Sequence, residues 1–121
     1  MKKQLSKSLI ERFSRQIILK NIGILGQKKI LLSKVLIVGV GGLGSPAAEF
    51  LARSGIGKLG IIDYDKVSLS NLHRQSLYET SHVGKSKVQV IKKILNRINP
   101  NTKVQTYNLQ LNNNNFKKII K

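Results

Sequence analysis

The chain has 121 residues, which is enough for one domain with a modest core and too few for a second. It contains no cysteine, so disulfide bonds, thiolate chemistry and a cysteine-ligated zinc site are excluded within it. Its 22 Lys and Arg against 5 Asp and Glu give a net charge of +17, which attracts nucleic acid, acidic proteins or polyphosphates.

Other features of the composition limit what this charge means. Lysine and asparagine are abundant along the whole chain, and that bias explains the charge equally well. The basic residues are scattered, and three Phe and three Tyr are the only aromatic side chains that could stack on bases. Nucleic-acid binding therefore stays a minor alternative. No apolar run reaches transmembrane length and no signal peptide is recognisable, so we expect a cytoplasmic protein without membrane contact.

The first predicted element is an amphipathic helix over residues 5–19. An apolar side chain recurs there at every fourth position, at Leu5, Leu9, Phe13 and Ile17. Arg12 and Arg15 share a neighbouring face, and periodicity alone indicates that both are solvated. A shorter helical pattern around residues 27–32 follows. We therefore divide the chain into a helical segment, 1–33, and a partial nucleotide-binding domain, 34–121.

The clearest pattern begins at residue 34. Residues 35–38 form an unbroken aliphatic run, typical of a strand buried on both faces of a parallel sheet. Ser45 and Pro46 then predict a helix N-cap and first turn. A second apolar run, residues 59–62, ends at Asp63, about 20 residues beyond the turn between these elements. That turn fits G-x-G-x-x-G and holds the glycines Gly39, Gly41, Gly42 and Gly44.

This order of elements suits a nucleotide for physical reasons. Glycine lacks a Cβ, so a phosphate can approach the backbone amides of the turn, and the following helix adds partial positive charge. A carboxylate on the next strand, here Asp63 with Asp65 close by, can accept hydrogen bonds from ribose hydroxyls. The turn alone leaves ATP and a dinucleotide such as NAD as alternatives.

Residues 66–87 show no clean periodicity, and loops of this length are usually functional or disordered. They contain side chains suited to oxyanions: Ser70, Asn71, Arg74, Gln75, Lys85 and Lys87. His73 and His82 lack metal-ligand partners at helical spacing, so we interpret both as ordinary loop residues and expect no metal site.

The remaining elements complete an α/β pattern. Residues 85–98 carry a helical apolar stripe that Pro100 ends, residues 103–108 alternate as a strand, and a further helix begins near residue 116. The predicted fold is a Rossmann-like parallel sheet with flanking helices, with strands near 35–39, 58–63 and 103–108.

Five motifs occur in an order that carries a specific resemblance. They are R-F-S-R-Q at 12–16, the glycine turn at 39–44, D-Y-D at 63–65, S-N-L-H-R-Q at 70–75 and G-K-S-K at 84–87. With these motifs the chain resembles the ThiF/MoeB (HesA) branch of the ubiquitin-activating enzyme superfamily. Members bind ATP and adenylate the C-terminal glycine of a ubiquitin-like sulfur carrier of the ThiS or MoaD type, in thiamine or molybdopterin biosynthesis.

The resemblance implies a role for each matching residue. Gly41 and Gly42 would lie under the phosphates, within a turn that also includes Gly39 and Gly44, and Asp63 would hold the ribose beside Asp65 and Ser70. Asn71, Arg74 and Lys87 would contact the α, β and γ phosphates. Arg15 would enter the ATP site of a second subunit, as in family homodimers, which replaces the solvated interpretation. Arg15, Arg74 and Lys87 are thus the candidate catalytic residues.

Family members continue well beyond a region of this length. The continuation holds a fourth strand, an Asp that helps to bind magnesium and, in many members, a zinc site. We therefore expect this chain to be the ATP-binding half, truncated after about three strands, with Mg²⁺ required but its Asp ligand and any zinc site missing. The alternatives are an NAD-binding oxidoreductase fragment and a basic nucleic-acid-binding protein.

Overall fold

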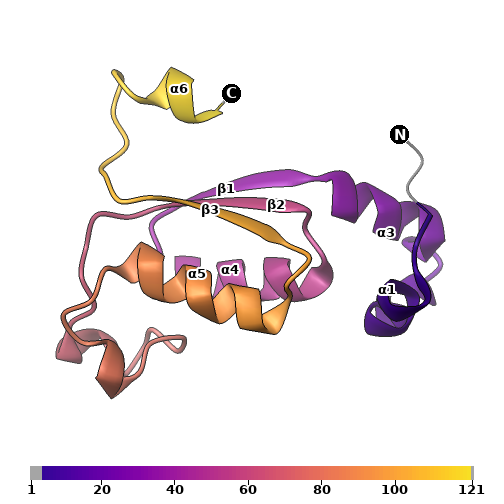
Figure 1. The fold of residues 1–121 in the computed structure, drawn as a ribbon, viewed down its shortest axis with the longest axis horizontal. Helices are drawn as coiled ribbons and strands as arrows, with labels where there is room; N and C mark the ends of the chain where they lie inside the picture. Colours follow the sequence, from indigo (N-terminus) through magenta and orange to yellow (C-terminus); the bar gives the residue numbers. More distant parts are fainter. Residues whose placement is uncertain (1–3, 121) are drawn as a thin grey trace.

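Three parallel strands form the centre of the structure, a computed structural model that describes residues 4–120. They are β1 (Lys34–Val38), β2 (Lys58–Ile62) and β3 (Lys103–Tyr107), in the spatial order β1-β2-β3. Lys34 lies opposite Lys58, which lies opposite Lys103. The observed strands agree with the predicted ones to within one residue at each end (Figure 1).

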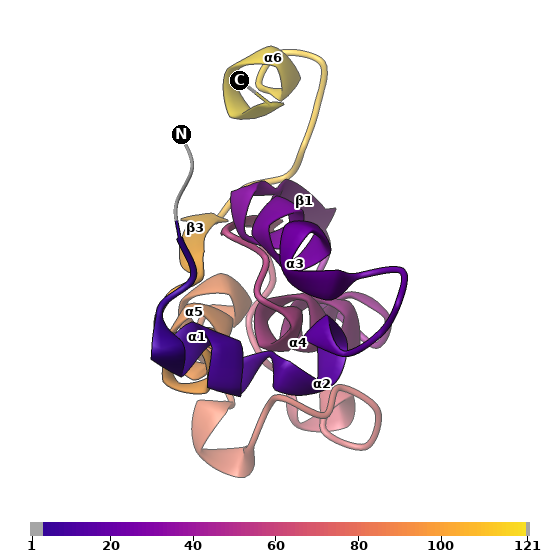
Figure 2. The ribbon, with the colours of Figure 1, turned by 90° about the vertical axis from the view of Figure 1, so that its right-hand side faces the viewer.

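Two helices cover one face of this sheet. Figure 1 shows α4 (Gly44–Ser54) and α5 (Lys87–Ile98) side by side below the strands, while α6 (Phe116–Ile120) lies on the other side. Figure 2 shows the same layers from the side. The core between sheet and helices consists of Val40, Ala48, Ala52, Leu59, Ile61, Val88, Ile91, Leu95 and Val104. The predicted α/β Rossmann-like class is therefore confirmed.

The N-terminal segment differs from its prediction. Instead of one helix over residues 5–19 it forms α1 (Lys7–Arg12) and α2 (Ser14–Ile17), followed by α3 (Gly23–Leu32), which leads into β1. The break falls at Phe13, whose backbone leaves the helical region at φ −105° and ψ 14° and whose side chain is 1% exposed. Burial of this one ring overrides the helical periodicity. Residues 1–3 of the predicted segment and Lys121 lie outside the described residues.

The region without periodicity is ordered by tertiary contacts. It forms two 3-10 turns, η1 (Leu69–Asn71) and η2 (Thr80–His82), and closes with an antiparallel bridge between Lys66 and Ser86. Val67 and Tyr78 pack against Val90 of α5 in a second small core. No helix within residues 4–120 is long and apolar enough to cross a membrane.

The aliphatic pattern of β1 is typical of a strand buried on both faces, but in this chain β1 is only partly buried and lies at the edge of the three-stranded sheet. Val35 and Ile37 pack on the core, but Val38 is 59% exposed, and β1 pairs with a neighbour on one side only among the described residues. On the face away from α4 and α5, Leu36 lies next to Gly60. An aliphatic strand is thus left at the edge of the sheet with unpaired backbone groups, an arrangement that favours pairing with another chain.

We therefore expect the 121-residue chain, expressed alone, to self-associate or precipitate. The unpaired amides and carbonyls of β1 and the exposed aliphatic side chains beside them provide the driving force. Light scattering or analytical ultracentrifugation over a range of protein concentrations measures this. A stable monomer at all concentrations would contradict the prediction.

Candidate functional site

The turn between β1 and α4 presents free backbone donors. The amides of Gly41 and Gly42 make no hydrogen bond with any residue from 4 to 120, and they lie at the N-terminus of the 11-residue helix α4. Unpaired amides at a helix N-terminus form a site for a phosphate or another anion. The glycine turn therefore has the donors that its sequence predicts.

The shape of this turn depends on Gly44. Gly39 has φ +91°, and its carbonyl oxygen lies so close to Gly44 that a Cβ there would overlap it.

The predicted N-cap at Ser45 is wrong, because α4 begins at Gly44 and Leu43 precedes it. Ser45 is fully buried, and its hydroxyl donates to the carbonyl of Val40 at 2.7 Å. The helix starts two residues earlier than predicted, and the glycine at its first position allows this close approach.

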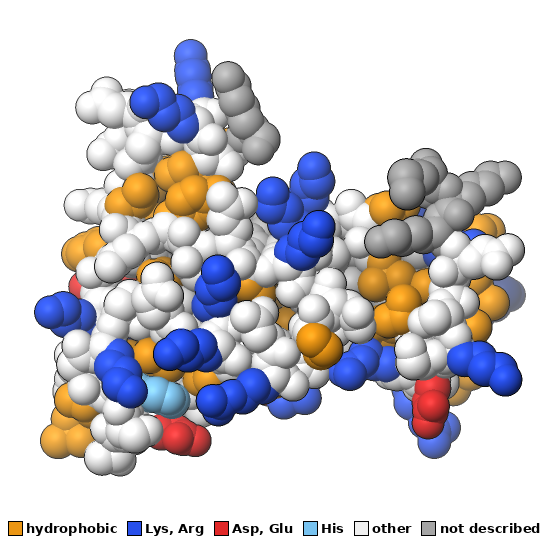
Figure 3. All heavy atoms as spheres, viewed as in Figure 1, with side chains coloured by type: hydrophobic (Ala, Val, Ile, Leu, Met, Phe, Trp, Pro, Cys, Tyr) orange, Lys and Arg blue, Asp and Glu red, His pale blue; other side chains and the backbone are white. Residues whose placement is uncertain are grey.

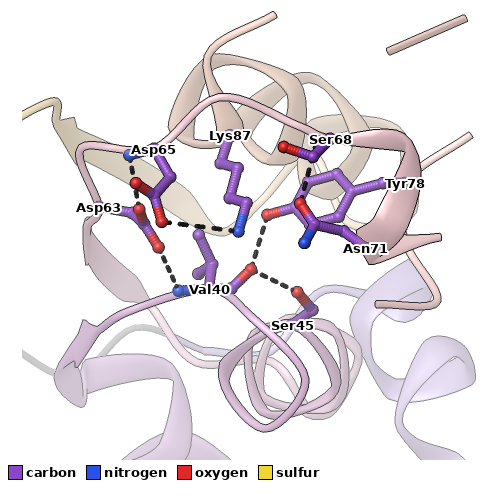
Figure 4. A network of polar contacts seen from close by, with 8 residues as sticks. All are labelled: Val40, Ser45, Asp63, Asp65, Ser68, Asn71, Tyr78 and Lys87. Carbon is purple, nitrogen blue, oxygen red and sulfur yellow. Dashed lines mark hydrogen bonds and ion pairs between the residues drawn. The ribbon is translucent and has the colours of Figure 1, made fainter. Parts of the chain in front are cut away.

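Asp63 connects the end of β2 to the glycine turn. Its Oδ2 accepts from the amide of Val40 at 2.9 Å, and its Oδ1 accepts from the amide of Asp65 at 2.8 Å (Figure 4). Both carboxylate oxygens thus accept hydrogen bonds from backbone amides, a role that the sequence did not reveal. Each carboxylate oxygen has a second lone pair, so the group keeps the capacity to accept from a ribose hydroxyl.

Lys87 brings a positive charge to the same place. Its side chain is 6% exposed, and its Nζ lies 4.0 Å from Oδ2 of Asp65 and 6.0 Å from the centre of the Tyr78 ring. Figure 4 shows the ammonium group pointing toward the backbone at Val40. An ammonium that is buried with a single carboxylate beside it is a good partner for an additional anion.

Tyr78 is a residue that sequence reasoning missed. Its hydroxyl donates to the carbonyl of Val40 at 2.8 Å, beside the bond from Ser45. Burial raises the pKa of Tyr78 above its ordinary value of 10.0, and the nearby Asp63 carboxylate raises it further. The phenol therefore remains a neutral donor that fixes the start of the glycine turn. The G-x-G-x-x-G pattern gave no signal for it, because the contact spans 38 residues.

The segment from Ser70 to Gln75 lies over the glycine turn. The Arg74 stem is 4.0 Å from where a Cβ on Gly42 would lie, and the Gln75 amide nitrogen is 3.6 Å from the equivalent point on Gly41. Gln75 is 3% exposed, and its Oε1 has no partner among the described residues. This arrangement places the stem of an arginine beside Gly42 and a side-chain amide beside Gly41, next to the free backbone donors.

Two residues of this segment also stabilise its backbone conformation through hydrogen bonds. Arg74 donates through Nη1 to the carbonyl of Ser70 at 3.0 Å, and Oδ1 of Asn71 accepts from the amide of Ser68 at 3.0 Å. The Nδ2 group of Asn71 makes no hydrogen bond within residues 4–120. The structure thus brings the glycine turn together with Asp63, Asp65, Ser70, Asn71, Arg74 and Lys87.

Arg15 does not join this group. Its neighbour Gln16 donates to the carbonyl of Ser54, the last residue of α4, whereas the glycine turn lies at the first residue of that helix. At about 1.5 Å per residue, the 11 residues of α4 separate the two ends by roughly 16 Å. Figure 1 shows the N-terminal helices at the end of the sheet where the strands begin. Arg15 therefore cannot reach the glycine turn of its own chain.

Both histidines lie in the loop, and their rings form hydrogen bonds with its backbone. Nδ1 of His73 donates to the carbonyl of Ser70, and Nδ1 of His82 accepts from the amide of Glu79. No group of three or more His, Asp or Glu side chains gathers within the described residues.

A separate basic hollow lies outside the glycine turn. It has a volume of about 550 Å³ beside α5, and Lys85, Lys93 and Arg97 are among the residues that line it. Figure 3 shows Lys and Arg side chains gathered on this face. Neither Phe nor Tyr lines the hollow, so it lacks the stacking side chains typical of nucleic-acid sites.

Fold and site together define a Rossmann-like βαβ unit with a cationic loop over its glycine turn, the class of architecture that binds nucleotides. The model of the ThiF family matches residues 13–121, and the chain belongs to this family. It is 47% identical over 112 residues to an adenylyltransferase and sulfurtransferase MOCS3 from Aedes aegypti, and 45% identical over 111 residues to that of Xenopus laevis. The predicted family is therefore confirmed.

Solved structures show the same fold. The E. coli tRNA N6-threonylcarbamoyladenosine dehydratase TcdA is 30% identical with a TM-score of 0.89, over 98% of this chain and 48% of that one. E. coli MccB, solved with ATP, is 35% identical with a TM-score of 0.80, over 89% of this chain and 34% of that one. The two MOCS3 matches span 93% and 92% of this chain but 26% and 25% of the relatives, so the chain spans about a quarter of their length.

The close approach at Gly44 generates a prediction about stability. Gly44→Ala should lower the free energy of unfolding by at least about 2 kcal/mol, because the turn backbone must move to admit the methyl group. Gly42→Ala is the matched control, since a Cβ there meets only the Arg74 stem at 4.0 Å and should change stability by no more than about 0.5 kcal/mol. Urea unfolding at equal protein concentration compares them, and equal stability of the two variants would contradict the observed turn.

Proposed function

We propose that this chain is the ATP-binding part of an adenylyltransferase that activates the C-terminal glycine of a ubiquitin-like sulfur-carrier protein. The observation that carries the proposal is the position of two cations at the glycine turn. The stem of Arg74 lies over Gly42, and the buried ammonium of Lys87 points toward Val40, the residue before the free amides (Figure 4). A triphosphate needs several donors and cations at one place, and these four residues provide them.

Each residue has a task in the proposed reaction. A carboxylate oxygen of the carrier's last glycine attacks the α-phosphorus of ATP, the bond from that phosphorus to the bridging oxygen breaks, and pyrophosphate leaves. Negative charge then grows on the phosphates. Asn71, Arg74 and Lys87 hold the α, β and γ phosphates, the turn amides lie beneath them, and Asp63 accepts from the ribose.

The similarity to curated relatives supports the choice of a protein substrate. The chain is 47% identical to a MOCS3 adenylyltransferase and sulfurtransferase, compared with 35% for MccB and 30% for TcdA. A sulfur carrier of the ThiS or MoaD type therefore fits better than the peptide or tRNA substrates of the other two. We also propose a homodimer in a cytoplasmic setting, with Arg15 of each subunit completing the site of the other.

The distance of Arg15 from its own glycine turn supports this last assignment. An arginine about one helix length away acts on the site only if it belongs to a second copy of the chain. Its exposed side chain is available for that role.

The test is a mixing experiment on a chain completed with the C-terminal part of its longer relatives. Arg15→Ala, Arg74→Ala and Lys87→Ala should each slow carrier-dependent exchange of pyrophosphate into ATP by at least about 100-fold, the scale of losing one charge-stabilising donor. Mixing Arg15→Ala with Lys87→Ala should restore about a quarter of normal activity. About half of the dimers are hybrids after random exchange of subunits, and one of the two sites in each hybrid is intact.

The control mixes Arg74→Ala with Lys87→Ala. Both substitutions then disable the site of their own chain, so no hybrid site is intact and activity should stay low. Recovery in the control mixture, or near-normal activity of any folded single variant, would contradict the assigned roles.

A further inference from the structure

Two glutamines tie three segments of the chain together far from the glycine turn. Gln27 of α3 is fully buried; its Nε2 donates to the carbonyl of Ser54 at 3.0 Å, and its Oε1 accepts from Nε2 of Gln16 at 2.7 Å. Nε2 of Gln16 also donates to the carbonyl of Ser54 at 3.0 Å. The end of α4 is thereby bonded to both α2 and α3.

The side chains around these hydrogen bonds are tightly packed. Gly55, which ends α4 with φ +99°, would place a Cβ 2.8 Å from Nε2 of Gln27 and 2.8 Å from Cζ of Phe13. Phe13 and Gln27 are thus both packed against the same glycine. Because the amide of Gln27 is bonded at both ends and enclosed, it has one orientation.

Arg15 lies between these anchors in the sequence. The buried Phe13 precedes it by two residues, and the bonded Gln16 follows it directly. The helix that carries Arg15, α2, has four residues and no side-chain cap at its start. A helix this short has no stability of its own, so its position depends on the contacts of its neighbours.

We propose that Gln27, acting through Gln16, is a positioning residue that holds Arg15 in the orientation needed to enter the ATP site of a second subunit. The inference rests on the proposed function of Arg15. A donor that stabilises developing charge must be held within a fraction of an ångström, and its support must come from neighbouring side chains.

Hydrogen bonds suit this task better than apolar packing. Phe13 holds the segment against α4 but permits sliding, because apolar contact is not directional. The bonds from Gln16 and Gln27 to one carbonyl oxygen fix the rotation of α2 about its axis. Burying the amide of Gln27 is costly unless it is bonded, so its hydrogen bonds favour this one arrangement of α2 and α3 over others.

The first experiment reports on the segment itself. Gln27→Met keeps the size of the side chain and removes both of its hydrogen bonds. In the completed chain, tryptic cleavage after Arg15 should accelerate about tenfold, because proteolysis follows the population of the open segment. Gln89→Met is the matched control, since Gln89 is exposed on α5, and it should leave the cleavage rate unchanged. Equal rates in the two variants would overturn the anchoring role.

The second experiment separates positioning from general damage to the fold. In the completed chain, Gln27→Met should slow pyrophosphate exchange at least about tenfold. Mixing it with Lys87→Ala should restore activity, because the Lys87→Ala subunit supplies a well-placed Arg15, whereas mixing it with Arg15→Ala should not. A Gln27→Met chain whose own site is damaged would give no recovery with Lys87→Ala, and that result overturns the inference.

The outcomes also distinguish this inference from the proposed function. If the unsubstituted completed chain shows no carrier-dependent exchange, the proposed function fails. If Arg15→Ala keeps full activity, the role of Arg15 is wrong and the positioning role of Gln27 fails with it, while the adenylation itself stands. If Arg15→Ala is inactive but Gln27→Met retains full activity, only the positioning role is wrong.

Discussion

One hydrogen bond, from the amide of Val40 to the Asp63 carboxylate, holds the site in its shape. The carbonyl of the same Val40 accepts from Ser45 and Tyr78, so this residue is held from β2, from α4 and from the following loop. With Val40 fixed on both sides, the chain must turn at Gly41 and Gly42, and their amides remain free. The residue that fixes the glycine turn is therefore a valine, which acts through its backbone amide and carbonyl alone.

The strands and the glycine turn were predictable because their signals are local. Aliphatic runs at residues 35–38 and 59–62 and the spacing of the glycines depend on no distant contact. Asp63 could be placed at the end of β2 for the same reason. Its bond to Val40 could not, since a carboxylate that binds ribose and one that binds backbone give the same pattern in a sequence.

The predictions that failed did so where distant contacts override local ones. The helix over residues 5–19 breaks at Phe13 because that ring packs against Gly55. Ser45 is drawn to the carbonyl of Val40 instead of capping α4. The exposure of β1 depends on the number of strands, which a five-residue pattern does not contain. The loop over the glycine turn was recognised through its family motifs rather than through periodicity.

Cations reach the site by two different routes. Lys87 is buried and approaches from the start of α5, whereas Arg74 is exposed and extends over Gly42 from the loop. The buried cation has the larger effect on a bound phosphate, because less water screens it. The exposed lysines elsewhere on the surface are screened and contribute little at physiological salt.

The central claim is that the site is built for a triphosphate, and calorimetric titration of the completed chain with ATP and with NAD tests it most directly. The structure predicts tighter binding of ATP, and a Lys87→Ala variant should lose most of that preference because the turn amides serve both ligands while Lys87 serves the additional phosphate. Tighter binding of NAD than of ATP by the unsubstituted chain would contradict the adenylyltransferase assignment.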